Sequence, residues 1–396
     1  MVFDGKQYIR VEDDRIAGEG AIGVWTKADS APHSTIFPMG DNERADPTRI
    51  VKGNPMAKWL ALAVAAAAVL AVVSWRFLSG PESPTVVVYV SHDQVFSEPV
   101  IKDFQRDTGV KVRAIYDTEE TKSTGAMNRL ISEKSNPQAD VYWANEPVRA
   151  EVLRQQGIAA PYVSPNADGV PASFKDPNGY WTGFAARARV LIVNKNIGTK
   201  PDSMLAYADA QWRGKTVVAN PLFGTTTTQI AALFVLWGDE RGQAFMNTLQ
   251  ENGIKLSPSN GDIADLVARG EFAFSLVDSD DVVSRVRQHL PIELVYPDQG
   301  AVGLGCFLVP NAVVLIAGAP HAELGKRLID YLLSKETEAK LARSDAAQIP
   351  LHSGVEGPPE LRPIDKIKTW NVNYAELAAK LQAIQPFLKR WVESGS

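Results

Sequence analysis

Short apolar runs alternate with segments of helical spacing from Thr85 onward. The runs are nearly continuous, as in strands that are buried on both faces of a parallel sheet. In the intervening segments apolar residues recur every three or four positions, which indicates helices with one buried face. Strands are expected at 85–91, 110–116 and 139–143, and helices at 99–108 and 121–134. This alternation predicts an α/β domain with a doubly wound sheet and a ligand site at the carboxyl ends of its strands.

A long apolar stretch at 180–195 breaks this alternation, which then starts again and runs to a second apolar stretch at 306–318. Two series of strands and helices joined by two crossovers are typical of a two-lobed clam-shell fold, periplasmic-binding-protein-like and of type II. We expect lobe 1 to comprise 85–185 and 315–396, so that the C-terminal helices return to it, and lobe 2 to comprise 190–305. The second series predicts strands at 215–220, 272–278 and 292–298 and helices at 227–237 and 240–252.

The N-terminal region has a different pattern. Trp59 to Trp75 form an uncharged run of 17 residues, which apolar residues extend to position 78, and this is long enough to span a bilayer. Basic residues precede the run, whereas none follows Arg76 until Lys102. The positive-inside rule therefore places the N-terminus in the cytoplasm and the remainder outside. We expect a β-like remnant or disordered extension at 1–55, a transmembrane or signal-anchor segment, cleaved or retained, at 56–79, and a linker at 80–84.

Composition excludes several classes of protein. The chain has 41 Lys and Arg against 46 Asp and Glu, a net charge of −5, which argues against a nucleic-acid binder. Its single cysteine, Cys306, excludes an intramolecular disulfide, a C-x-x-C zinc or redox site, and a lipid-anchor cysteine. The apolar run at 59–78 is therefore the one membrane anchor that the sequence suggests.

Polar side chains follow each of the first three predicted strands, where a ligand of a parallel sheet would bind. His92 and the glutamates can equally be local hydrogen-bonding residues or helix-start residues that complement the helix dipole, and the asparagine can be a cap. The candidate residues are Ser91, His92 and Asp93 after the first strand, Glu119 and Glu120 after the second, and Asn145 and Glu146 after the third.

A run of four threonines, Thr225, Thr226, Thr227 and Thr228, follows a glycine turn in the second lobe and opens a helix. The first N–H groups of a helix have no internal partners, so this start suits an oxyanion such as phosphate, carboxylate or carbonate. Helix capping needs only one of the four hydroxyls. Arg187, in the first crossover, would add a charge-assisted bond to the same anion, with inter-lobe pairing as the alternative.

Three carboxylates lie within four residues at Asp278, Asp280 and Asp281. One of them can cap a helix, but three close carboxylates repel each other unless a positive charge neutralises them. This loop therefore predicts a site for a cation or an amine. Its spacing lacks the later glycine and glutamate of an EF-hand.

Four segments carry a family resemblance: VVVYVSHDQVFSEPVIKDFQRDTGVKV, NPQADVYWANEP, GEFAFSLVDSDD and YLLSKETEAKLA. They resemble the solute-binding proteins of ferric-iron-type ABC importers, over about 310 residues from Thr85. The resemblance implies a clam-shell fold, a role in import, and an ABC permease with its ATPase as partners. It also implies Fe(III) bound with a synergistic anion.

The family holds ferric ion with a histidine, a glutamate and two adjacent tyrosines, and this sequence departs from that set. Asp93 stands at the histidine position, next to His92, and Asn145 stands at the glutamate position, next to Glu146. The Asp278–Asp281 segment replaces the tyrosine pair. Carboxylates and an anion can still bind a hard cation. The candidate metal ligands are His92, Glu146, Asp278, Asp280 and Asp281.

The sequence therefore predicts the substrate-binding component of an ABC importer, monomeric and extracytoplasmic, that captures ferric iron with an anion by closure of its cleft. One alternative is a binder of a small phosphorylated, phosphonate or carboxylate organic solute, which the threonines and an amine-binding aspartate loop would hold at opposite ends. A second alternative is a membrane-anchored sensory domain. The sequence contains no G-x-S-x-G, H-E-x-x-H or Walker motif, so we expect no enzyme.

Overall fold

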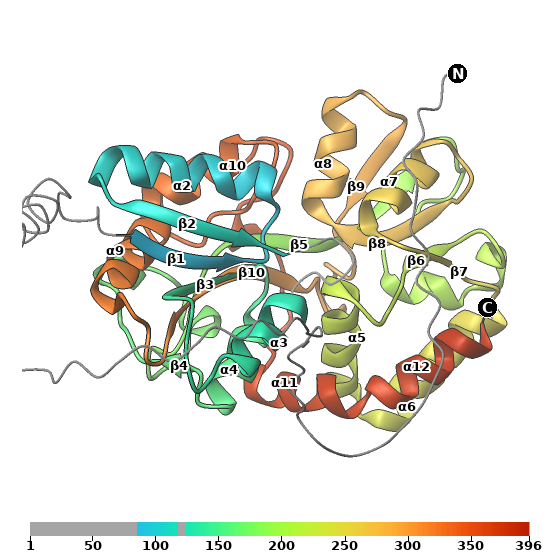
Figure 1. Cartoon of the computed structure of the whole chain (residues 1–396). Coiled ribbons are helices and arrows are strands. Elements are labelled where there is room, and N and C mark those ends of the chain that lie inside the picture. The colour runs from blue at the N-terminus through green and yellow to red at the C-terminus, as the bar shows by residue number, and fades with distance from the viewer. Residues whose placement is uncertain (1–84, 118–123, 396) are drawn as a thin grey trace, which may run out of the picture. The chain divides into compact units, whose positions relative to one another are not determined.

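Figure 1 shows a computed structural model, which describes residues 85–117 and 124–395. The N-terminal extension, the predicted membrane segment with its linker, and the candidates Glu119 and Glu120 lie outside the described residues. Within the described ranges, no helix combines the length and the apolar character needed to cross a bilayer.

The first lobe is built on three parallel strands, as the apolar runs predict. Strand β1 lies between β2 and β3, with Val88 paired to both Ala114 and Val141. The strands are β1 (Thr85–Val90), β2 (Lys111–Tyr116) and β3 (Val141–Ala144), and the helices that follow them are α2 (Gln94–Thr108), α3 (Thr124–Ser132) and α4 (Pro147–Gln155). Helix α2 ends at Gly109, whose φ of 68° places it in the left-handed region, which a glycine adopts without strain.

Helix α2 begins five residues before the predicted start at Pro99. Proline is common in the first turn of a helix because it has no N–H to leave unpaired, and this favoured a start at that position. In the structure Pro99 lies inside the helix, and Ser97 donates to the carbonyl of Asp93 at 2.9 Å. The loop after β1 is therefore only three residues long, which brings Asp93 close to the strand end.

Two long strands join the lobes, where the sequence predicts extended crossovers. Strand β5 (Thr182–Asn194) pairs along its first half with β10 (Leu308–Ile316) and along its second half with β8 (Phe274–Asp278) and β9 (Ile292–Val295). All thirteen residues of β5 are buried. The sheet order is β2-β1-β3-β10-β5-β8, so one continuous sheet runs from lobe to lobe, and the predicted two-lobed α/β fold is confirmed.

The second lobe adds a parallel pair of short strands and four helices. The strands are β6 (Val217–Ala219) and β7 (Lys255–Ser257), and the helices are α5 (Gly224–Trp237), α6 (Asp239–Glu251), α7 (Asn260–Ala268) and α8 (Ser279–Arg287). The sequence analysis does not identify β7 and α7, since a strand of three residues shows no measurable alternation.

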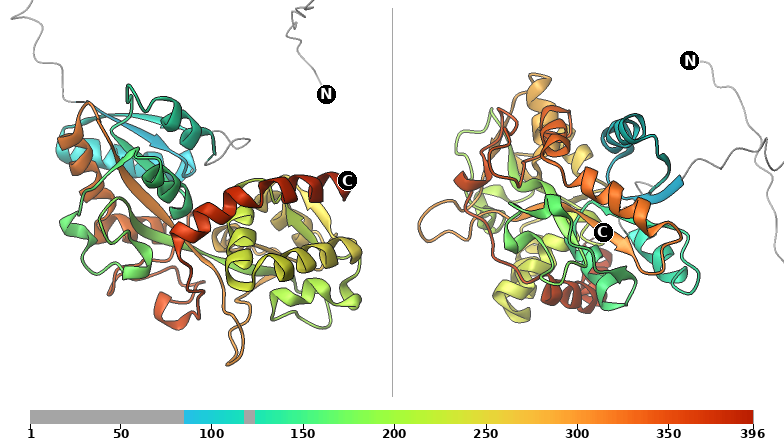
Figure 2. Two further views of the ribbon diagram at one scale, coloured as in Figure 1. Left: turned by 90° about the horizontal axis from the view of Figure 1, so that it is seen from below. Right: turned by 90° about the vertical axis from the view of Figure 1, so that its left-hand side faces the viewer.

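The C-terminal helices contact both lobes, whereas the sequence analysis assigns 315–396 to the first. After α9 (Ala322–Leu332) and α10 (Lys335–Arg343), helix α11 (Tyr374–Ala383) contacts α4 of the first lobe and α5 of the second. Helix α12 (Gln385–Ser394) lies beside α6, as Figures 1 and 2 show, and the indole N–H of Trp391 donates to the carbonyl of Met246 at 2.8 Å. Leu388 and Trp391 are both buried, so α12 has an apolar face to cover.

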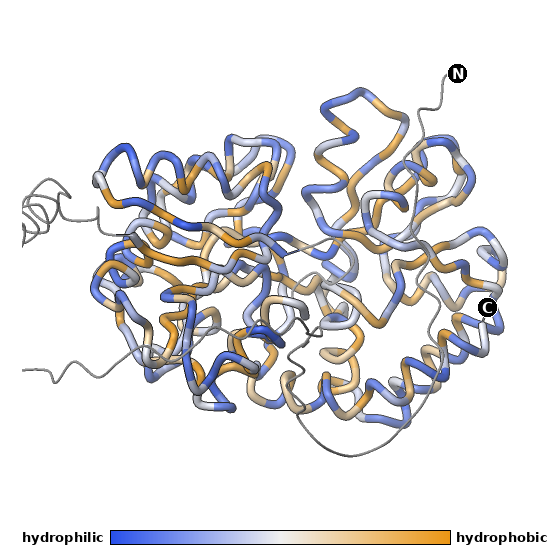
Figure 3. Tube along the Cα trace, in the orientation of Figure 1, coloured by the Kyte–Doolittle hydropathy of each residue, from blue (hydrophilic) through white to orange (hydrophobic). Residues whose placement is uncertain are grey.

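The remaining elements are short. They are the strand β4 (Ala159–Ala160) and the 3-10 turns at Pro165–Ala167, Ala172–Phe174, Met204–Ala208, Ala210–Trp212 and Ile364–Lys366. Apolar strands lie inside both lobes and polar helix faces lie outside, as Figure 3 shows. The fold therefore leaves the loops at the strand ends as the main polar groups between the lobes.

Candidate functional site

A polar cavity of about 220 Å³ lies where loops of both lobes meet. The first lobe contributes Asp93 after β1 and Asn145 after β3, and the crossover strand β5 contributes Arg187. The second lobe contributes the segments that begin α5, α7 and α8. The other lining residues are Ala219, Asn220, Phe223, Gly224, Thr225, Thr226, Pro258, Ser259, Asn260, Gly261, Asp278, Asp280 and Asp281.

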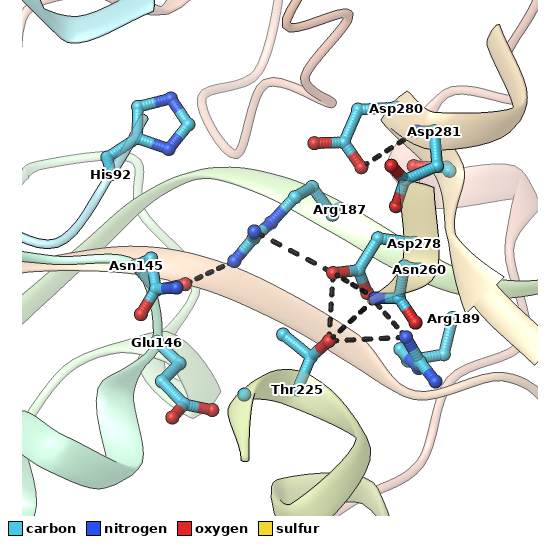
Figure 4. A network of polar contacts seen from close by, with 12 residues as sticks. His92, Asn145, Glu146, Arg187, Arg189, Thr225, Asn260, Asp278, Asp280 and Asp281 are labelled. Carbon is cyan, nitrogen blue, oxygen red and sulfur yellow. Dashed lines mark hydrogen bonds and ion pairs between the residues drawn. The ribbon is translucent and has the colours of Figure 1, made fainter. Parts of the chain in front are cut away.

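Asp278 is the centre of a buried network, drawn in Figure 4. The antiparallel register pairs Arg189 of β5 with Asp278 of β8, and the two side chains form an ion pair at 3.1 Å. The hydroxyl of Thr225 donates to the other carboxylate oxygen at 2.9 Å, and Arg187 lies 3.7 Å from the same oxygen. Burial alone would raise the pKa of Asp278, but the two arginines and these hydrogen bonds hold the pKa below its ordinary value. Asp278 is therefore an anion that is already paired.

Arg187 connects the two lobes across the cavity. Its Nη2 donates to the backbone carbonyl of Asn145 in the first lobe, and only 5% of the residue is exposed. Burial works to lower the pKa of its guanidinium, but Asp278, Asp280 and Asp93 outweigh burial and raise the pKa. Its Nε has no hydrogen-bond acceptor among the described residues. Because buried donors are normally satisfied, this N–H is available to an anion in the cavity.

The four threonines at the start of α5 have different surroundings. Thr225 and Thr226 line the cavity and also accept hydrogen bonds from Arg189, at 3.2 and 3.3 Å. Thr227 is fully buried, and its hydroxyl has no partner within the described part of the chain. Thr228 donates to Glu146 of the first lobe. No side chain caps this helix, so its first N–H groups form the kind of site that binds anions.

Carboxylates form another part of the cavity wall. Asp280 and Asp281 stand in the first turn of α8, and Asp93 approaches from the first lobe. Oxygen atoms of Asp278, Asp280 and Asp281 lie within 4.8 Å of one another. In the view of Figure 4, Asp280 and Asp281 lie on the opposite side of Arg187 from Thr225. The cavity thus offers donors at one end and carboxylates at the other.

Three predicted site residues do not line this cavity. Ser91 bonds to Asp117 at 3.0 Å and to Tyr142 at 2.9 Å. The ring of His92 stacks on Trp143, with centroids 5.6 Å apart, and is set away from the network in Figure 4. These side chains point into the first lobe because the β1 strand continues to alternate its faces up to Asp93.

Glu146 is also absent from the cavity wall. It is fully buried and pairs with Arg149 at 3.1 Å. Burial raises the pKa of this carboxyl, although Arg149 and the Thr228 hydroxyl oppose the increase. Together with Thr228, Glu146 forms a contact between the lobes rather than part of the cavity.

Asn260 and Gly261 line the cavity, but the sequence analysis did not single them out. They open α7, whose cap Ser259 accepts a hydrogen bond from the N–H of Asp262 at 3.1 Å. The spacing of Ser259 and Asp262 is a helix-start signal that would have located this third loop.

Comparisons with known proteins agree with this geometry. The family described as bacterial extracellular solute-binding protein matches residues 100–364. Iron uptake protein A1 of Synechocystis sp. is 26% identical, over 69% of this chain and 79% of its own length. A putative 2-aminoethylphosphonate-binding periplasmic protein of Salmonella typhimurium is 24% identical, over 73% of this chain and 84% of its own. The crystal structure of iron-bound HitA from Pseudomonas aeruginosa superposes with a TM-score of 0.69 at 21% identity, covering 77% of this chain and 99% of that one.

Proposed function

Because the chain belongs to the bacterial extracellular solute-binding protein family, we propose that it captures a small solute outside the cytoplasm for a membrane importer. The family match confirms the resemblance found in the sequence, and a binding role agrees with the expectation that the chain is no enzyme. Its partners are then an ABC permease and ATPase, which would recognise the closed form. Solute would shift the population of the two lobes from open to closed.

The proposed solute is a small zwitterion with a phosphonate or phosphate group and an amine. The observation that carries this proposal is the unpaired Nε of buried Arg187 beside the uncapped start of α5. Both favour an anion. The carboxylates of Asp93, Asp280 and Asp281 line the same cavity and would accept hydrogen bonds from an ammonium group. The relative named for 2-aminoethylphosphonate supports the same class.

Ferric ion with a synergistic anion is the second candidate. It is favoured by the carboxylate oxygens of Asp278, Asp280 and Asp281 within 4.8 Å and by the relatives named for iron. Two features of the cavity weigh against it. Asp278 is already paired with Arg189 and Arg187, whose charges would repel a metal ion. Among the described residues, no tyrosine lines the cavity to supply a phenolate.

A thermal-shift comparison of the full-length chain separates the two candidates. We expect 2-aminoethylphosphonate to raise the melting temperature and ferric citrate to leave it unchanged, because a solute stabilises only the state it binds. The double variant Asp280→Asn, Asp281→Asn should lose most of the shift with the aminophosphonate, since it keeps shape and removes the charges that hold the amine.

Asp365→Asn is the matched control for this experiment, because Asp365 is exposed and lies outside the cavity wall. It should retain the full shift. A shift with ferric citrate that the double variant abolishes, together with none for the aminophosphonate, would support the iron assignment instead.

A further inference from the structure

An apolar groove of about 670 Å³ adjoins the polar cavity. Its floor comes from Met127 of α3 and Val152 of α4 in the first lobe, and its other wall from Leu222 and Phe223, just before α5. Leu381 of α11 also lines it, and glutamines and a lysine of the C-terminal helices form its polar edge. Figure 1 shows α3, α4, α11 and the start of α5 close together, and α11 contacts both α4 and α5.

Phe223 makes the groove continuous with the cavity, because its side chain lines both. The next residues, Gly224 and Thr225, open the helix start that would hold the anion of the solute. Phe223 is 47% exposed. It is the one aromatic residue among the exposed large hydrophobic residues of the described chain. An exposed apolar surface of this kind beside a binding cavity marks a ligand contact more often than chance.

The sizes of the two spaces support a shared occupant. Ligand pockets generally measure about 300–1,000 Å³, and the polar cavity of about 220 Å³ is smaller than that range. The groove of about 670 Å³ is within it. A solute that occupies only the cavity would leave Phe223 and the groove in water.

We propose that the solute carries an apolar substituent, alkyl or aryl, close to its anionic group, and that this substituent lies in the groove against Phe223. The inference rests on the proposed function and narrows its solute class to aminophosphonates or amino phosphate esters with an apolar side group. The substituent branches near the phosphorus because Phe223 is adjacent to the anion-binding helix start. The groove then selects among solutes that share the same polar ends.

A homologous series of 1-aminoalkylphosphonates tests this selection. The full-length chain is titrated calorimetrically with members whose alkyl group grows from one to six carbons. The polar ends are constant through the series, so affinity should rise about fourfold for each methylene buried. In Phe223→Ala the affinity for the shortest member should stay within about twofold of wild type, and the gain with length should be largely lost.

Val302→Ala is the matched control, since Val302 is fully exposed and lines neither the groove nor the cavity. It should keep the complete gain with chain length. Equal affinity for all members would overturn the groove assignment while leaving the proposed function intact. A loss in Phe223→Ala that is the same for short and long members would also overturn it, because Phe223 would then act in lobe closure. If neither the shortest member nor 2-aminoethylphosphonate binds, the proposed solute class fails and this inference fails with it.

Discussion

Asp278 ends strand β8 at the cavity, where Arg189, Arg187 and Thr225 already contact its carboxylate. Three aspartates in four residues predict a cation site on charge alone. The two arginines come from a crossover strand about ninety positions earlier in the chain, and no local pattern pairs residues at such a separation. The sequence therefore locates the acidic loop but does not separate the aspartate held by arginines from the two in the first turn of α8.

Replacing Asp278 tests this distinction. Asp278→Asn leaves two buried guanidinium groups without their counter-charge, so the free energy of unfolding should fall by about 3–5 kcal/mol. Asp280→Asn, whose residue is only half-buried, should change it by less than about 1 kcal/mol. Chemical denaturation of both variants measures the difference. Equal, small effects would contradict a structural role for Asp278.

His352 provides a test by pH. Its Nδ1 lies 2.8 Å from buried Glu338 and its Nε2 lies 2.9 Å from the carbonyl of Asn166. The hydrogen bond with Glu338 raises the pKa of His352 against the effect of burial. A raised pKa in the folded state gives stability that is complete below the unfolded pKa and is lost as pH rises through the folded one.

His352→Gln should therefore destabilise the protein more at pH 6 than at pH 9, by about 1–2 kcal/mol. Urea unfolding of wild type and variant at the two pH values measures this difference. A penalty that is independent of pH would show that His352 is neutral at both, and would contradict the charged pair.

At the scale of elements, the hydrophobic pattern predicts the long crossover β5 but not the irregularity within it. The β5–β10 register shifts between Pro310 and Asn311. On β5, Ala185 has a φ of 43° and gives its N–H to Glu338 at 2.7 Å rather than to a strand. Alanine rarely adopts this conformation, and nothing in a run of apolar residues indicates it. The acceptor that stabilises it lies 153 positions away.

Ala185→Gly and Ala188→Gly form a matched pair on this strand, since both alanines are fully buried. Glycine in a regular strand costs about 0.5–1 kcal/mol, which Ala188→Gly should lose. Ala185→Gly should lose about 1 kcal/mol less, because glycine relieves the left-handed strain. Differential unfolding of the two variants gives the comparison. An equal loss in both would mean that the bulge at Ala185 carries no strain.

The starts of the second-lobe helices show how far local patterns identify a site. The glycine turn and four threonines predict the start of α5, and two of the four line the cavity. Which two could not be predicted, because the answer depends on contacts with Arg189 and with Glu146 of the other lobe. The α7 start was missed because its preceding strand has only three residues.

For the whole molecule, alternation and crossovers are sufficient to predict two lobes, because each strand buries a short apolar run and each crossover a long one. They do not predict the packing of the C-terminal helices. Helix α11 contacts both lobes, and α12 covers α6 of the second lobe through Trp391. Amphipathic helices show which face is buried but not which partner covers it. The polar cavity between the lobes also depends on this assembly, since Asn145 and Arg187 approach it from different parts of the chain.

The central claim is that the closed cavity binds a zwitterion through Arg187 at one end and aspartates at the other. Calorimetric titration of the full-length chain with 2-aminoethylphosphonate tests it most directly. We predict saturable binding of one molecule per chain, which falls at least about tenfold in Asp280→Asn, Asp281→Asn and persists in Asp365→Asn. No binding of the aminophosphonate, with saturable binding of ferric citrate under the same conditions, would contradict the account.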